Sequence, residues 1–304
     1  AIVANRRRWR DLPCATKPPA PEDISGARAR GAVIIPAYNE AAVIERTLQP
    51  LSQAAVDGFI ELVVVCNGCT DDTAARARSF PGVQVVELEV GSKPLALNTG
   101  DKVATLWPRL YLDADIEITA TATIAVLDRL RDGDVLAARP SFRYDSDGAG
   151  LLVRSYYRAR RKMPLHQNAL WWAGVYGLTK QGHERFGQFP DVTGDDMFVD
   201  AQFKIHEKAV VQTVPSVWRT PTNVKGLTAI LSRHHRGNTE LVASDPVRIP
   251  RTGNATAGAI LRTICGPRSA ADAAVYLGIA LVSRMRAARG AAAWERDDSS
   301  RSGR

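Results

Sequence analysis

Two aspartates separated by a single alanine follow an apolar stretch in the middle of the chain. Asp113 and Asp115 come directly after residues 110–112, whose sequence is LYL. Buried carboxylates are costly unless another charge compensates them. Mg2+ and Mn2+ are often bound by one or two carboxylates together with phosphate oxygens of a substrate. The pair therefore indicates a cation site beside a phosphorylated substrate, although a capped loop would show the same spacing.

A second acidic pair lies closer to the C-terminus, in the sequence Gly194-Asp195-Asp196. Adjacent carboxylates raise each other's pKa, and burial raises it further. A carboxylate with a raised pKa can act as a general base. A helix that begins here, with acids in its first turn, would require the same residues because the helix dipole favours negative charge there. Both interpretations stay open at this point.

A basic cluster, RHHRG, occupies residues 233–237. Arg233 and Arg236 could bind phosphate groups, and a solvated basic face is the alternative. His234 and His235 are neighbours on an expected helix, so their side chains point about 100° apart and are poorly placed to share one metal ion.

The stretch GSKPLALN at residues 91–98 combines a glycine turn, Lys93 and the start of an expected helix. This combination is typical of a phosphate-binding turn. Its spacing differs from that of a P-loop. No G-x-G-x-x-G follows the first expected strand, which argues against a dinucleotide-dependent enzyme.

The four cysteines are too few and too scattered for a disulfide framework in a chain of 304 residues. Cys66 and Cys69 form a C-x-x-C, but no second pair is present to complete a zinc site. A redox pair is also disfavoured, because the surrounding loop has another explanation given below. A reducing cytoplasm is the expected compartment.

Alternating strands and helices are expected to position these residues. The apolar runs predict strands at 32–35, 61–66, 84–88 and 109–112, and helical spacing predicts helices at 41–51, 70–79, 95–105 and 121–130. Four such repeats predict an α/β sheet with helices on both faces. Ligands of these sheets bind beyond the C-terminal ends of the strands. We therefore expect residues 36–40 and 66–72 to meet Asp113 and Asp115 around one crevice.

The alternation breaks after residue 135. We expect a helix at 151–163, an aromatic, glycine-rich loop at 171–178, a strand at 209–217, and helices at 227–243 and 269–289 with a loose joint at 254–258. The predicted division is a basic, proline-rich segment at 1–30, a catalytic domain at 31–218, a C-terminal helical region at 219–289 and a disordered basic tail at 290–304.

The net charge of +8 is concentrated at the two ends of the chain, in arginines 6, 7, 8 and 10 and arginines 284, 286, 289, 296, 301 and 304. Such ends suit anionic lipid or phosphate, and solvated tails are the alternative. Residues 270–289 could form an interfacial membrane helix or pack on the core or a partner. No apolar run is long enough to span a bilayer. We expect a cytoplasmic protein, with peripheral contact at the inner face of the cell membrane as an option. Aromatics are not interleaved with the basic ends, so nucleic acid is not an expected partner.

The order of the motifs resembles that of family 2 glycosyltransferases with the GT-A fold. The sequence contains VIIPAYNE (33–40), VVVCNGCTDD (63–72), GSKPLALN (91–98), YLDAD (111–115), GDD (194–196) and RHHRG (233–237). The resemblance covers roughly residues 31–240. It implies a Rossmann-like, mostly parallel sheet followed by C-terminal helices. The activity that it implies is inverting transfer from a nucleotide-sugar donor, assisted by a divalent metal, Mn2+ or Mg2+.

The resemblance also implies roles for individual residues. Asp196 would be the general base with Asp195 beside it, Asp115 and Asp113 would bind the metal, and Arg233 and Arg236 would bind the leaving diphosphate. The donor nucleotide would contact the remaining matching residues: Pro36, Tyr38, Asn39, Glu40, Cys66, Asn67, Asp72, Lys93, Asn98 and Asp113.

Three positions depart from the family pattern. Residues 66–69, CNGC, replace the usual Asp-Asp-Gly-Ser, which removes an acid that contacts the base in many members and so weakens the case for a uridine donor. The same variation explains the C-x-x-C. His234 replaces a tryptophan common in processive members, which favours transfer of a single sugar. Asp195 replaces a glutamate, a conservative change.

The expected acceptor is a hydroxyl on a glycan, a lipid-linked acceptor or a small molecule, in cell-surface glycan, glycolipid or secondary-metabolite synthesis. The aromatic loop at 171–178 and the helix at 151–163 are expected on the acceptor side. One alternative is a sugar-1-phosphate nucleotidyltransferase, but residues 36–40 match its glycine- and arginine-rich loop poorly. Another is a non-catalytic, membrane-associated scaffold, which the retention of all four acids disfavours.

Overall fold

The computed structural model describes residues 29–163, 169–244 and 258–288 of the chain. The predicted N-terminal segment up to residue 28, the first four residues of the predicted joint at 254–258 and the predicted tail at 290–304 lie outside these residues.

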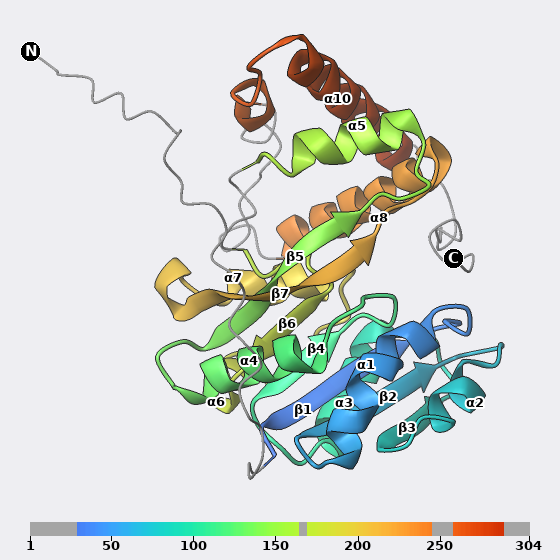
Figure 1. Ribbon diagram of the computed structural model, residues 1–304, viewed down its shortest axis with the longest axis vertical. Helices are drawn as coiled ribbons and strands as arrows, with labels where there is room; N and C mark the ends of the chain where they lie inside the picture. The colour runs from blue at the N-terminus through green and yellow to red at the C-terminus, as the bar shows by residue number, and fades with distance from the viewer. Residues whose placement is uncertain (1–28, 164–168, 245–257, 289–304) are drawn as a thin grey trace, which may run out of the picture.

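A seven-stranded sheet forms the centre of the protein, in the order β3-β2-β1-β4-β6-β5-β7. Within it β6 alone runs antiparallel to its neighbours, β4 and β5. The arrangement, visible in Figure 1, confirms the predicted mostly parallel α/β sheet. The strands are β1 (Gly31–Ala37), β2 (Ile60–Asn67), β3 (Val83–Leu88), β4 (Arg109–Leu112), β5 (Ala137–Asp145), β6 (Val175–Leu178) and β7 (Lys208–Arg219).

The helices largely follow the predicted alternation. They are α1 (Ile44–Val56), α2 (Thr73–Arg78), α3 (Lys93–Val103), α4 (Ala120–Arg131), α5 (Leu151–Arg160), α6 (Lys180–His183), α7 (Asp195–Ala201), α8 (Val224–Ser244) and α10 (Pro267–Ala288), with a 3-10 turn at Ile205–Glu207. None of the helices in the described part of the chain is long and apolar enough to cross a membrane.

Several helix starts differ from the prediction by two or three residues, and those of α1 and α3 have local reasons. α1 begins three residues late because the amide of Ala41 donates to the Asp71 carboxylate and that of Glu40 donates to the Thr73 hydroxyl. These bonds fix a turn before the helix. α3 begins two residues early because the Ser92 hydroxyl accepts from the Leu95 amide, which caps the helix at Ser92.

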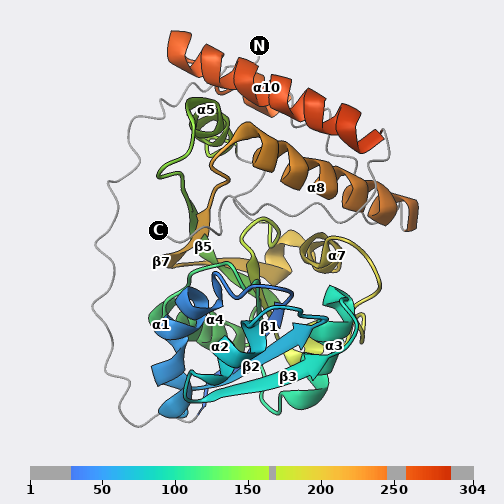
Figure 2. The same cartoon turned by 90° about the vertical axis from the view of Figure 1, so that its right-hand side faces the viewer.

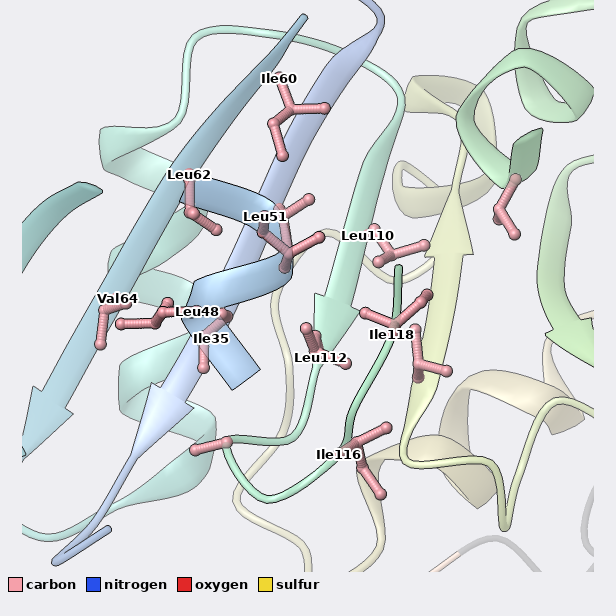
Figure 3. Packing of buried hydrophobic residues seen from close by; sticks show 14 of the residues in the cluster. Ile35, Leu48, Leu51, Ile60, Leu62, Val64, Leu110, Leu112, Ile116 and Ile118 are labelled. Carbon is pink, nitrogen blue, oxygen red and sulfur yellow. The ribbon is translucent and has the colours of Figure 1, made fainter. Parts of the chain in front are cut away.

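Both faces of the sheet are covered by helices. Along β1, the side chains of Val33 and Ile35 pack with α1 and α4, whereas Ile34 belongs to a second cluster with α3 and α7. Figure 3 shows Leu48 and Leu51 of α1 packed against the face of the sheet that carries Val33 and Ile35. Strands buried on both sides are continuously apolar, which is why the sequence shows unbroken apolar runs there.

The C-terminal helices form a third layer with a core of its own. α5, α8 and α10 contribute to one apolar cluster, which includes Tyr156, Leu227 and Tyr276. Figures 1 and 2 show this layer at one end of the molecule, beyond β5 and β7. The predicted division at residue 218 stays a prediction, and α5 packs with the helices that follow that boundary.

Two strands were not predicted, and each has a physical reason. β5 contains Arg139 and Pro140, which interrupt its apolar pattern; the pairing with β7 shifts register between Pro140 and Phe142. The Arg139 guanidinium is buried and donates to the carbonyl oxygens of Ala169 and Pro140. β6 has only four residues, inside the stretch predicted as a loop. Its strand geometry depends on pairing with β4, a contact that local sequence does not specify.

Candidate active site

A pocket of about 640 Å³ lies beyond the C-terminal ends of β1, β2 and β4. Most of the predicted site residues line it: Pro36, Tyr38, Glu40, Asn67, Lys93, Asp113, Asp115, Asp195, Asp196 and Arg233. A smaller pocket of about 100 Å³ shares Asp113, Asp115, Asp196, Arg233 and His234 with it. The crevice expected from the sheet topology is therefore present, and it brings the two acidic pairs to one cavity.

Lys93 lies between the two acidic pairs. Its Nζ atom is 2.7 Å from an oxygen of Asp113 and 2.7 Å from an oxygen of Asp195. Burial opposes the positive charge, but the two carboxylates outweigh it and raise the pKa of Lys93. Burial also raises the pKa of Asp113, while Lys93 opposes that shift. The ammonium group thus compensates the acidic charge that the sequence left unexplained.

The second acidic pair occupies the first turn of α7, as the helix interpretation required. Gly194 precedes it with φ of +109°, a left-handed conformation that favours glycine. Asp195 is buried and accepts a hydrogen bond of 2.8 Å from the Tyr176 hydroxyl as well as the contact from Lys93. Asp195 is therefore fixed by two partners from different elements.

Asp196 faces both pockets. Its carboxylate accepts hydrogen bonds from the amides of Trp172, at 3.0 Å, and Met197, at 2.8 Å. Burial, reinforced by the charge of Asp195, raises the pKa of Asp196 to about 7. A carboxyl group with that pKa can accept a proton near neutral pH, as a general base must. Asp196 can therefore lie in the first turn of a helix and also have the properties of a general base.

The backbone around Asp113 and Asp115 is fixed by α1. The Thr47 hydroxyl donates to the carbonyl oxygen of Ala114 at 2.8 Å, and Arg46 donates to that of Asp115 at 3.3 Å. In the described residues, no group of three or more His, Cys, Asp or Glu side chains could hold a metal ion. Two carboxylates whose coordination is completed by diphosphate oxygens and water are typical of Mg2+ sites. The residues therefore fit a metal that binds together with the donor.

At the end of the pocket predicted to bind the nucleotide, Asn67 lines the wall and its amide donates to the Ala37 carbonyl oxygen at 2.9 Å. Asn39 has φ of +53° and its side chain accepts from the Thr70 amide at 2.7 Å. Cys66 and Cys69 are free thiols, and the Cys69 sulfur lies 3.4 Å from both the Asn39 amide and the Ala37 carbonyl oxygen. Cys66 lies in β2 and Cys69 in the loop that follows it, so the C-x-x-C spans the end of β2 and the loop that leads to α2.

Five predicted residues are not on the wall of the pocket: Asn39, Cys66, Asp72, Asn98 and Arg236. Asp72 is exposed at the start of α2, and the neighbouring Asp71 accepts the hydrogen bond from the Ala41 amide in the turn before α1. The Asn98 amide donates to the carbonyl oxygen of Phe189 at 2.9 Å, and its oxygen accepts from the Phe189 amide at 2.8 Å. Asn98 therefore positions the loop that leads to Asp195 instead of contacting a ligand in this arrangement.

The basic cluster lies on α8 and faces the site with one side only. Arg233 and His234 line both pockets. The ring of His234 lies 4.5 Å from that of Trp172, and burial lowers its pKa well below the usual range, so this histidine is neutral at pH 7. Gly237 packs against Thr193, where a Cβ atom would lie 2.4 Å from the Thr193 carbonyl oxygen. The glycine allows α8 to approach the loop before Asp195 closely.

Two aromatic residues that contact the acidic pair were not predicted from the sequence to do so. Tyr176 is bonded to Asp195, and Trp172, with φ of +71°, donates to Asp196. The guanidinium of buried Arg160 lies 3.7 Å from the centre of the Trp172 ring. The aromatic composition of residues 171–178 was the available signal, but the partners became visible only when β6 paired with β4.

Comparison with known proteins agrees with this geometry. The family model described as glycosyl transferase family 2 matches residues 32–194. No curated protein matches the sequence. The mannosyltransferase PcManGT from Pyrobaculum calidifontis, in complex with GDP-Man and Mn2+, is similar with a TM-score of 0.55 and 23% identity, over 94% of this chain and 81% of that one. Glucosyl-3-phosphoglycerate synthase from Mycobacterium tuberculosis, in complex with Mn2+ and UDP-Glc, has a TM-score of 0.53 and 20% identity, over 73% of this chain and 80% of that one. At these identities the structural matches establish a shared GT-A type fold.

Proposed function

We propose, from the premise that the chain belongs to glycosyltransferase family 2, that it transfers one sugar with inversion from a nucleotide-sugar donor to a hydroxyl acceptor. The observation that carries the proposal is the single pocket lined by Asp113, Asp115, Lys93, Asp196 and Arg233. It combines a phosphate-binding side with a carboxylate whose pKa lies near neutrality. The family match favours this function over a nucleotidyltransferase and over a non-catalytic scaffold.

Each group of the pocket has a distinct task in the proposed reaction. Asp196 accepts the proton of the acceptor hydroxyl as its oxygen attacks the anomeric carbon. Attack from the face opposite the leaving nucleotide inverts the configuration in one displacement. Lys93 and Arg233 stabilise the negative charge that develops on the diphosphate. A divalent metal, Mn2+ or Mg2+, held by Asp115 and Asp113 would supply further positive charge to the same oxygens.

The acceptor in this proposal is a hydroxyl of a glycan, a lipid-linked acceptor or a small molecule. Trp172, Trp218 and Ile230 line the smaller pocket beside Asp196 and form an apolar surface suited to a sugar ring or another flat apolar group. Neutral His234, in place of the tryptophan of processive members, supports transfer of one sugar. The products would belong to cell-surface glycan, glycolipid or secondary-metabolite synthesis.

A panel of nucleotide sugars tests the proposal. Purified protein is incubated with UDP-, GDP-, dTDP- and ADP-sugars and Mn2+, Mg2+ or EDTA, and nucleoside diphosphate release and product mass are measured. We expect metal-dependent turnover of one donor and an inverted anomeric configuration by NMR. Asp196→Asn should lose about 10²-fold or more in turnover, and the exposed Asp132→Asn should not. Retained configuration, or full activity of Asp196→Asn, would overturn the proposal.

A further inference from the structure

The outermost helix, α10, has an exposed face without a charged residue between its two ends. The helical period places the residues that form this face within an arc of about 120° around the helix axis. Leu281, Val282 and Met285 are 60%, 54% and 47% exposed. The opposite face packs through Tyr276 and Ile279 into the third cluster. The exposed face consists of Ala270, Ala271, Ala274, Gly278, Leu281, Val282 and Met285.

Almost every charged side chain around this face is positive. Residues 151–163 and 258–288 contain a single acid, Asp272, which is buried and lies 2.6 Å from Arg158. The same two ranges contain nine basic residues, of which six are exposed: Arg154, Arg161, Lys162, Arg262, Arg268 and Arg284. The layer formed by α5 and α10 is therefore strongly positive.

A basic groove of about 460 Å³ separates the end of α5 from the start of α10. Its charged lining consists of Arg158, Arg161, Lys162 and Arg268 together with Asp272, which is paired with Arg158. Exposed apolar side chains, Leu261 and Ile264, lie in the segment just before α10. A groove of this size can take a phosphate group, and the apolar side chains next to it suit the hydrocarbon that a phospholipid carries.

We propose that α5 and α10 form a membrane-docking surface for anionic lipid. The apolar face of α10 would enter the boundary between headgroups and acyl chains, and the basic groove would bind lipid phosphates. Charge favours this occupant over a second copy of the chain, because a symmetric pair would bring arginines against arginines. The position of α10 as the outer layer, seen in Figure 2, leaves the face accessible at the end of the molecule. This surface is separate from the active site, and the inference does not depend on the proposed reaction.

Vesicle cosedimentation of the full chain tests the inference, with phosphatidylcholine vesicles alone or mixed with phosphatidylglycerol. We expect binding to the anionic vesicles that weakens with salt. Each basic residue near an anionic surface contributes about fivefold to partitioning, so Arg161→Glu with Lys162→Glu should lower it more than about tenfold. Leu281→Glu with Met285→Glu should do the same through the apolar face. Lys180→Glu and Ile205→Glu, at exposed positions outside the layer, are the matched controls.

Three outcomes would overturn the inference. One is equal binding to neutral and anionic vesicles. Another is unchanged binding by both double variants while circular dichroism shows that they are folded. The third is conversion of a dimer to a monomer by Leu281→Glu with Met285→Glu, without vesicle binding by the parent chain, which would assign the face to self-association. Loss of binding by both double variants, with the controls unchanged, supports the docking surface.

Discussion

The ammonium group of Lys93 lies 2.7 Å from the Asp195 carboxylate, and Asp195 is adjacent in sequence to the proposed base, Asp196. The same ammonium group contacts Asp113, which is on the proposed metal and donor side. One cation of α3 therefore links the two acidic pairs, which lie more than eighty residues apart in the sequence. A change in the charge of a donor bound near Lys93 can therefore affect the proposed base, Asp196, through this contact.

Lys93→Met should lower turnover by about 10²-fold, since it removes a cation that would stabilise the leaving diphosphate. It also leaves the buried Asp195 without a charged partner, which should cost about 1–3 kcal/mol in unfolding free energy. Steady-state kinetics and a urea melt measure the two effects. Lys102→Met, an exposed lysine of the same helix, is the control. Wild-type kinetics and stability in Lys93→Met would contradict the assigned role.

The raised pKa of Asp196, about 7, predicts a pH profile. The base must be deprotonated, so kcat/KM should fall about tenfold per pH unit below pH 7 and level off above it. The stability of the protein should change with pH in the opposite direction. Between about pH 4 and 7 the Asp196 carboxyl keeps its proton in the folded protein but has lost it in the unfolded chain, so the unfolding free energy should decrease as the pH rises through this range.

Asp196→Asn is the control for both measurements, because an amide does not titrate. Its unfolding free energy should lack the component that decreases between pH 4 and 7. A wild-type kcat/KM that stays constant from pH 5 to 8 would show that Asp196 is not the base whose protonation limits the reaction.

The sequence predicted the first half of the sheet well because the information there is local. Residues 109–112 form β4 with the predicted bounds, since a short apolar run between polar residues has few other solutions. The two acidic pairs could be recognised from residue type and order. The partners of those acids could not, because Tyr176 and Trp172 reach them only through the antiparallel pairing of β6 with β4. Asn98 was placed correctly in a helix, but its partner, Phe189, lies 91 residues further along the chain.

Asn98→Ala distinguishes a positioning role from the direct donor contact that the family resemblance implies. Loss of both hydrogen bonds to Phe189 should destabilise the protein by about 1–3 kcal/mol and lower kcat, because the loop before Asp195 is released. The KM for the donor should change little. Thermal unfolding and initial rates over a donor series provide the measurement. A large increase in donor KM with unchanged stability would instead support the direct contact.

Gly237→Ala tests the close packing of α8 against the loop that carries the acidic pair. The added Cβ atom would lie 2.4 Å from the Thr193 carbonyl oxygen, so either the helix or the loop must shift. We expect a loss of about 1–3 kcal/mol in stability and a clear drop in turnover, because Thr193 immediately precedes Gly194-Asp195-Asp196. Gly278→Ala is the matched control: it lies in α10 with nothing within 4 Å of its added Cβ and should stabilise the helix by about 0.5–1 kcal/mol. Full turnover in a stabilised Gly237→Ala variant would show that α8 does not set the position of the acidic pair.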